Sequence, residues 1–299
     1  MAMYNASLAG GGSSVTIDDV VYEGDLKLKS KIVNINIGDL PYDFYDGCAV
    51  VLNNEIHILG TELNTNYKSH YKFNGTSWVS VSTLPYDFYW GCAVVYNNEI
   101  HILGGYYNRT SHYKFNGTSW VSVSTLPFSC CQSCAIVLNG EIHILGSSVT
   151  SYMKYHYKFN GTSWVSVSTL PYDFKLGSAV VYNNEIHILS SYNNSSEYTY
   201  HYKFNGSSWS SASTLPYDLH GGSAIAFNDE IHILGGNGGF SNHYKWDGSS
   251  WLQLKELPYM YCDGCVVLFN NSICTLGSDR TDNQKYAYVI DAPIYEIAS

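Results

Sequence analysis

A block of sixteen residues, HYKFNGTSWVSVSTLP, occurs three times without a change, at 70–85, 112–127 and 156–171. Copies at 201–216 and 243–258 carry substitutions but keep the pattern. Leu-Pro pairs close successive units and begin at Leu40, Leu84, Leu126, Leu170, Leu215 and Leu257. Successive pairs lie 42 to 45 residues apart. A tandem period of this length excludes most helical repeats and is typical of a four-stranded unit.

Within one unit the sequence is strand-like throughout. Residues 91–105, GCAVVYNNEIHILGG, form two β-rich runs around Asn97 and Asn98, and residues 112–123 form two more around Asn116-Gly117. Asn-Gly between such runs predicts a type I′ hairpin, because both central residues of that turn need a positive φ. No long segment has apolar residues at helical spacing. The chain is therefore predicted to be all-β, with four antiparallel strands per repeat.

The amino-acid composition argues against some classes of binding partner for this chain. Charged residues make up 13% of the chain and the net charge is -10, which argues against a nucleic-acid partner. No apolar run is long enough to cross a membrane, so membrane insertion is not expected. The first residues, MAMYNASLAGGGSSVTIDD, lack the basic and apolar regions of a secretory signal. We expect synthesis in the cytoplasm, and the Asn-Gly-Thr sequons are better explained as turns.

The repeat resembles the kelch motif. The resemblance rests on an apolar strand ending in Gly-Gly (HILGG at 101–105 and 232–236), an aromatic residue further on, a Trp and then Leu-Pro. It covers about residues 31–299 and implies a β-propeller in which each repeat supplies one blade. Fold does not specify function, because propellers include both binding modules and enzymes.

Six strands of the GCAVV type predict a six-bladed kelch-type propeller over residues 31–299. The sixth repeat has no Trp-containing fourth strand, whereas VNINIGDLP (33–41) matches WVSVSTLP. We therefore expect the N-terminal strand to complete the last blade, which removes two exposed strand edges. The tail APIYEIAS (292–299) is the competing candidate for that strand.

The loops of the two propeller faces differ in how far they vary among the repeats. Turns of the YNNE and FNGTS type, on one face, are nearly constant, and we call this the constant face. Loops on the other face change in sequence and length, for example TELNTNYKS at 61–69 against GNGGFSN at 236–242. We call this the variable face. Its loops are rich in Tyr, Ser, Asn and Gly, the composition of an antibody-like binding surface.

The predicted ligand contacts are the aromatic, charged and polar residues of these variable loops. They are Tyr45, Asp46, Tyr89, Trp90, Tyr106, Tyr107, Arg109, Tyr152, Lys175, Tyr192, His220 and Tyr261. The alternative is that long loops tolerate change because nothing packs on them, and that their aromatic residues cover the next blade.

Histidines repeat in five blades, for example at His57 in a second strand and His70 in a third. Neighbouring sheets pack about 10 Å apart, so equivalent histidines of different blades cannot share one metal ion. We interpret them as packing residues that fill a position where kelch proteins have an aromatic, with Cys274 and Lys285 in their place in blade six.

Two CxxC pairs, at 131–134 and 262–265, match the minimal pattern of a zinc site. Cys134 and Cys265 also occupy the position of Cys48 and Cys92 at the start of an inner strand, which needs a small residue, so buried free thiols are favoured. Repeated acidic residues such as Asp43 are interpreted as turn caps. We predict no metal, no cofactor and no catalytic residues.

The enzyme alternative rests on resemblance alone. Kelch propellers include galactose oxidase and six-bladed sialic acid epimerases, but no residue-by-residue match to either active site is found. Catalysis requires dissimilar residues converging on one point. The unusual residues here, among them Arg109, Lys175 and His220, are spread one per loop.

Residues 1–30 are predicted to be a flexible N-terminal connector, because they open with a Gly/Ser-rich stretch. They are similar to connector segments of phage and prophage tail proteins of gut-type bacteria. That resemblance implies a virion-associated adhesion head. The predicted function is a non-catalytic binding module for a glycan or surface protein. The alternatives are a kelch-type protein–protein adaptor and a carbohydrate-modifying enzyme; the oligomeric state stays open.

Overall fold

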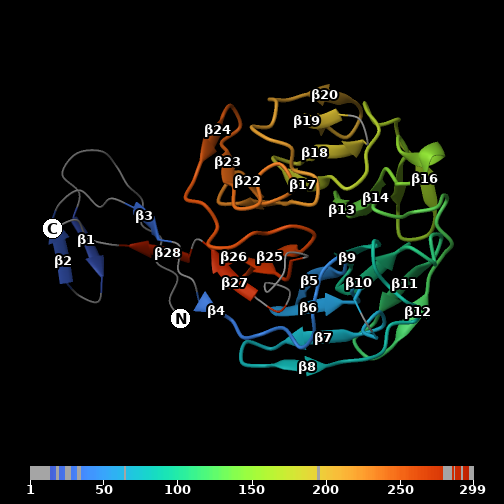
Figure 1. Cartoon of the computed structure of the whole chain (residues 1–299), viewed down its shortest axis with the longest axis horizontal. Coiled ribbons are helices and arrows are strands. Elements are labelled where there is room, and N and C mark those ends of the chain that lie inside the picture. The colour runs from blue at the N-terminus through green and yellow to red at the C-terminus, as the bar shows by residue number, and fades with distance from the viewer. Residues whose placement is uncertain are drawn as a thin grey trace.

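The computed structural model describes residues 35–63, 65–193, 196–278, 285 and 287–290, together with four strands nearer the ends. It is an all-β, six-bladed propeller in which each blade is a four-stranded antiparallel sheet (Figure 1). The first strand of every blade lies nearest the axis, and the later strands follow outward (Figure 1). The fold class predicted from the repeats is therefore confirmed.

The blades are numbered in chain order. Blade one contains β5 (Cys48–Leu52), β6 (Glu55–Leu59), β7 (His70–Phe73) and β8 (Trp78–Ser80). Blade two contains β9 (Cys92–Tyr96), β10 (Glu99–Leu103), β11 (His112–Phe115) and β12 (Trp120–Ser122). Blade three contains β13 (Cys134–Leu138), β14 (Glu141–Leu145), the short 3-10 helix η1 (Thr150–Tyr152), β15 (His156–Phe159) and β16 (Trp164–Ser166).

The remaining blades follow the same plan. Blade four contains β17 (Ser178–Tyr182), β18 (Glu185–Asn193), β19 (Ser196–Phe204) and β20 (Trp209–Ser211). Blade five contains β21 (Ser223–Phe227), β22 (Glu230–Leu234), β23 (His243–Trp246) and β24 (Trp251–Gln253). Blade six contains β25 (Cys265–Phe269), β26 (Ser272–Leu276), β27 (Ala287–Ile290) and β4 (Ile35–Asn36).

The N-terminal strand closes the ring. In β4, Asn36 pairs with Tyr288 of β27 and Ile35 pairs with Val289. The competing tail strand β28 (Ala292–Tyr295) pairs instead with β3 (Leu28–Lys31). The predicted N-terminal closure of blade six is therefore confirmed. Within the predicted connector, β1 (Ser14–Ile17) pairs with β2 (Val20–Glu23). Most of residues 1–30 lie outside the described residues, and the boundary near residue 30 stays a prediction.

Of the two kinds of turn on the constant face, one has the backbone geometry that the sequence predicts and the other does not. Asn97 and Asn98 have φ of 49° and 61°, as a type I′ turn requires. In the Asn116-Gly117 turn only the glycine has a positive φ, at 96°. The side chain of Asn116 instead accepts hydrogen bonds from the amides of Thr118 and Ser119. The predicted type I′ geometry is wrong there, because an Asx turn provides the reversal.

The histidines lie in the sheets as pairs within single blades. His57 Nδ1 and His70 Nε2 are 2.8 Å apart, and the same pair recurs in blades two to five. Burial lowers the pKa of His57 to about 4 and that of His70 to about 3, so both rings are neutral at neutral pH. In blade six, Ala287 lies opposite Leu276 as His243 lies opposite Leu234, so Lys285 does not replace a histidine.

The hydrophobic core lies between neighbouring blades. Blade two packs on blade one, with Ile100, Ile102 and Phe115 in one buried cluster with Val50 and Leu59. Among the described residues, no helix is long and apolar enough to span a bilayer.

Candidate functional site

A closed ring of backbone hydrogen bonds surrounds the axis at the variable face. One residue just before each inner strand contributes to it, and its amide donates to the carbonyl of the same residue in the preceding blade. The bonds are Trp90→Asp46 (2.9 Å), Gln132→Trp90 (2.7 Å), Leu176→Gln132 (3.2 Å), Gly221→Leu176 (3.3 Å), Asp263→Gly221 (2.6 Å) and Asp46→Asp263 (2.8 Å). All six residues have φ between 50° and 73°. We call these six residues the mouth ring.

The residues of the mouth ring border a cavity of about 230 Å³ at the end of the axial channel. Two of its six members, Asp46 and Asp263, are adjacent acids. Burial and the neighbouring charge of Asp263 together raise the pKa of Asp46 to about 9, although a hydrogen bond from Trp90 opposes the shift. A proton is therefore held at this side of the mouth at neutral pH.

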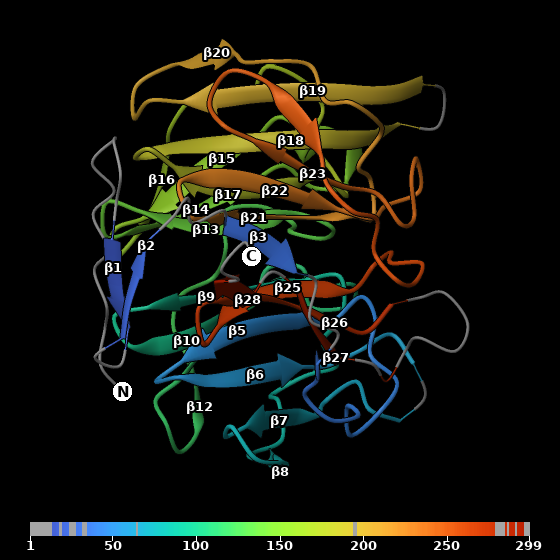
Figure 2. The same ribbon diagram turned by 90° about the vertical axis from the view of Figure 1, so that its left-hand side faces the viewer.

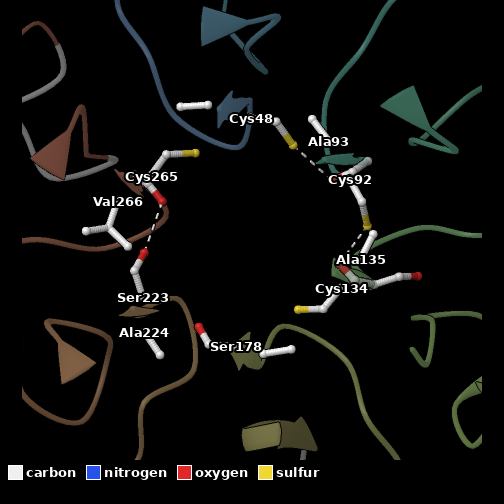
Figure 3. Close-up of a pocket in the computed structure, with 15 residues that line it drawn as sticks. Cys48, Cys92, Ala93, Cys134, Ala135, Ser178, Ser223, Ala224, Cys265 and Val266 are labelled. Atoms are coloured by element: carbon white, nitrogen blue, oxygen red, sulfur yellow. Dashed lines mark hydrogen bonds between the residues drawn. The ribbon is translucent and has the colours of Figure 1, made fainter. Parts of the chain in front are cut away.

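A second ring lines the channel deeper in, at the first residue of each inner strand (Figure 3). Each side chain donates to a carbonyl of the following blade: Cys48→Gly91 (3.3 Å), Cys92→Ser133 (3.0 Å), Cys134→Gly177 (3.1 Å), Ser178→Gly222 (3.1 Å), Ser223→Gly264 (3.5 Å) and Cys265→Gly47 (3.4 Å). The sequence predicts only that this position needs a small residue. The structure shows that it also provides a hydrogen-bond donor, which both thiol and hydroxyl supply.

The cysteines of both CxxC pairs are free. Burial raises the pKa of Cys134 and Cys265 to about 12, so both are neutral thiols. Among the residues that the structure describes, His, Cys, Asp and Glu form no group of three or more that could hold a metal ion.

Five aromatic rings from blades one and two gather beside the mouth, and we call them the aromatic cluster. They are Tyr67, Tyr89, Trp90, Tyr106 and Tyr107. Tyr89 and Tyr106 stack with centroids 5.4 Å apart, and the edge of Trp90 meets Tyr106 at 5.3 Å. The guanidinium of Arg109 lies 5.6 Å from the centroid of Tyr106 and its Nε donates to the Tyr106 carbonyl. The cluster is thus a preformed surface rather than separate loose rings.

The predicted ligand contacts in this region differ in how far their side chains are exposed to solvent. Tyr107 is 69% exposed, whereas Tyr89 is only 6% exposed and is surrounded by its neighbours. Tyr89 therefore positions the cluster and offers little surface to a ligand. Tyr261 is fully buried and occupies the core position of Phe44 and Phe88, with its hydroxyl 2.8 Å from Ser223. The prediction that Tyr261 lies at the rim is wrong, because its true equivalents are these core aromatic residues and not their variable neighbours.

A second group of predicted residues meets at the rim of blades four and five. Lys175 Nζ lies 5.2 Å from the ring centroid of Tyr192, and Tyr192 lies 4.8 Å from the ring of His220. His220 Nδ1 is 2.7 Å from Asp218 Oδ2. The sequence predicts that these residues are spread one per loop, but the structure brings them together: the entry loop and the outer loop of blade four pair, and Tyr192 lies against His220 in the entry loop of blade five. The amide of Tyr192, for example, donates to the Lys175 carbonyl.

The remaining predicted contacts lie elsewhere on the variable face. Tyr152 packs on Phe128 and Tyr155 at the edge of blade three. The amide of Tyr45 is 3.3 Å from the hydroxyl of the buried Thr61. Of the repeated acids, Asp218 caps the amide of His220, and Asp43 forms an ion pair with Lys285.

No protein-family model and no curated protein sequence matches the chain. The solved structure of YjhT is similar to it, with a TM-score of 0.71 and 16% sequence identity, covering 84% of this chain and 94% of YjhT. An identity this low shows the fold alone. The six-bladed propeller is therefore supported by a structural neighbour, while membership of the kelch family stays a prediction.

Proposed function

We propose that this propeller is a non-catalytic binding module that recognises a carbohydrate through its variable face, with the aromatic cluster as the principal contact. The observation that supports it is the packing of Trp90, Tyr106 and Tyr107 around the buried Tyr89. Aromatic faces offer sugars an apolar surface for their C–H groups, and the rings are already held in place before a ligand arrives.

The setting of the cluster also favours a sugar. Arg109 beside Tyr106 and Glu62 beside Asp46 supply charged hydrogen-bond partners at its edges. Hydroxyl groups of a sugar can use such donors and acceptors while its ring stacks on Tyr107. A role as the receptor-binding head of a phage tail stays a prediction from the resemblance of residues 1–30.

The test is a glycan array probed with the intact chain and with Tyr107→Ala, whose side chain is exposed. Leu252→Ala is the matched control, because Leu252 is 57% exposed on β24 at the outer edge of blade five. We expect Tyr107→Ala to weaken binding about tenfold, the loss of roughly 1.4 kcal/mol, and the control to leave it unchanged. Absence of binding to any glycan would contradict the proposal and direct the search to a protein partner.

A further inference from the structure

Ser190 is a conformational outlier in the variable face. It is fully buried and has a φ of 62°, in the left-handed region that β-carbon sterics disfavour. It also lies opposite a β-bulge, because between the pairs Leu189–His201 and Ser191–Tyr198 it is the single residue of β18 that faces two residues of β19. β18 and β19 are each nine residues long. Their ends beyond the bulge project from the variable face in Figure 2.

The other five blades all have glycine at this position. The equivalents are Gly60, Gly104, Gly146, Gly235 and Gly277. A Cβ added at any of them would come within 1.9 to 2.2 Å of a carbonyl oxygen at the entry of the next blade. Blade four thus keeps a side chain that its own sister repeats exclude. Backbone strain of this kind is retained mainly where the side chain has a function.

The hydroxyl of Ser190 begins a chain of hydrogen bonds that leads to the surface. Its Oγ donates to Asp218 Oδ1 at 2.9 Å, and Asp218 Oδ2 is 2.7 Å from His220 Nδ1. His220 Nε2 is 2.7 Å from Nδ2 of the exposed Asn237. Burial alone would raise the pKa of Asp218, but the hydrogen bonds from His220 and Ser190 outweigh it and lower that pKa. Asp218 is therefore a carboxylate, and its Oδ2 accepts a hydrogen bond from Nδ1–H of His220.

The same acid is placed differently in the sister repeats. Asp173 is exposed, and Asp87 lies 3.9 Å from Lys68 in a surface ion pair. Only Asp218 combines a 7% exposed side chain with a histidine two residues later. A buried carboxylate that holds Nδ1–H fixes the tautomer of the imidazole, so the lone pair of Nε2 faces outward.

We propose that Ser190, Asp218 and His220 form an acceptor site for a ligand hydroxyl, in which His220 Nε2 accepts the hydrogen bond. Asn237 Nδ2 marks the position that the donor occupies, and the ligand hydroxyl replaces this exposed amide. The ring of Tyr192, 4.8 Å from His220, offers an apolar face beside that hydroxyl. A hydroxyl next to a C–H face describes a sugar, so this site rests on the proposed function and adds a second contact to it.

The first test reads the tautomer of His220 by long-range ¹H–¹⁵N NMR of the intact chain, with the signals assigned by their loss in His220→Gln. We expect a protonated Nδ1 and an unprotonated Nε2. Asp218→Asn should abolish this pattern. A wild-type imidazole protonated at Nε2 would overturn the proposal, whatever the glycan array shows.

Two substitutions of Ser190 separate its hydroxyl from its strain. Ser190→Gly and Ser190→Ala both remove the hydroxyl, but only alanine retains the strained Cβ. Both should therefore loosen the His220 tautomer equally, while the glycine variant melts about 2–4 °C above the alanine variant. An unchanged His220 spectrum in both variants would show that Ser190 does not position the site.

The ligand test adds glucose, galactose, mannose and N-acetylglucosamine to the labelled protein. We expect at least one sugar to shift the Nε2 resonance of the wild type, and His220→Gln to weaken its binding about tenfold. Sugar binding that is undiminished in His220→Gln would refute the acceptor site and leave the aromatic cluster standing, as would a loss of binding confined to Tyr107→Ala. No Nε2 shift with any of these sugars would also overturn the acceptor site.

Discussion

The amide of Asp46 in the first blade donates a 2.8 Å hydrogen bond to the carbonyl of Asp263 in the sixth. Cys265 Sγ, deeper in the channel, reaches the Gly47 carbonyl of the first blade at 3.4 Å. Blades six and one are therefore joined by the same two contacts that join every other neighbouring pair. What distinguishes blade six is its outer strand β4, which comes from the other end of the chain.

Removal of β4 should loosen the ring. A chain that begins at Gly38 loses the pairing of β4 with β27 and the packing of Ile37 on the core between blades six and one. We expect a loss of roughly 2–3 kcal/mol in the free energy of unfolding, from the lost hydrogen bonds and apolar burial. Urea denaturation measures it, and a chain that begins at residue 32 is the control. Equal midpoints for the two chains would contradict closure by β4.

Acid should destabilise the fold through the histidine pairs. Burial lowers the pKa of His232 to about 4 and that of His243 to about 3, below the unfolded value near 6.5. The contribution of these neutral histidines to the free energy of unfolding is complete above pH 6.5. It is lost as the pH falls toward 4, because the unfolded chain then binds more protons than the folded chain. Each histidine contributes up to about 1.4 kcal/mol per pH unit in that window.

The sixth blade supplies the control for this prediction, since Cys274 and Ala287 replace the pair there. The double variant His232→Cys, His243→Ala should lose stability at pH 7 but show a smaller loss between pH 7 and pH 5 than the parent. Denaturant unfolding at the two pH values gives both numbers. An unchanged pH dependence would show that the pair does not titrate as described.

The ring of Cys and Ser side chains that lines the channel should tolerate a change from Cys to Ser but not one from Cys to Val. Cys134→Ser keeps a donor to the Gly177 carbonyl, as Ser178 and Ser223 do in their blades, so we expect a change within about 0.5 kcal/mol. Cys134→Val removes the donor and leaves the partly buried Gly177 carbonyl without it, at a cost of about 1 kcal/mol. Urea unfolding compares the two; equal stabilities would mean that the position needs only small size.

Two tyrosines of the aromatic cluster should respond in opposite ways. Tyr89→Ala removes a buried ring that contacts four other aromatic side chains, and should cost about 2–4 kcal/mol in unfolding free energy. Tyr107→Ala removes an exposed ring and should stay within about 0.5 kcal/mol. Thermal melting ranks the two variants. A larger loss of stability in Tyr107→Ala than in Tyr89→Ala would contradict the roles assigned to the two rings.

The repeat period, the strand pattern and the closing strand could all be predicted from the sequence, because each is local or recurs at a fixed spacing. The meeting of Lys175, Tyr192 and His220 could not, since it depends on how two loops of blade four pair and lie against the entry loop of blade five. The rim prediction for Tyr261 is wrong because Cys262 and Asp263, not Tyr261, correspond to the variable pair Tyr45-Asp46. A signal for Ser190 was present, as it is a serine at a position where all five sister repeats have glycine, but its bond to Asp218 needs the structure.

The mouth ring uses only main-chain atoms, although its residues are as different as Trp90, Gln132 and Leu176. On the proposed function, the main-chain atoms of these residues hold the ring together and their side chains are left for recognition. Exchanging a side chain at the mouth leaves the hydrogen-bonded circle beneath it intact, within the limits that a left-handed φ sets. On the proposed function, such a propeller acquires a new specificity blade by blade without refolding. The five mouth positions that already carry a side chain are the natural sites for a randomised library, because a Cβ at Gly221 would lie 2.7 Å from Cys262 Sγ.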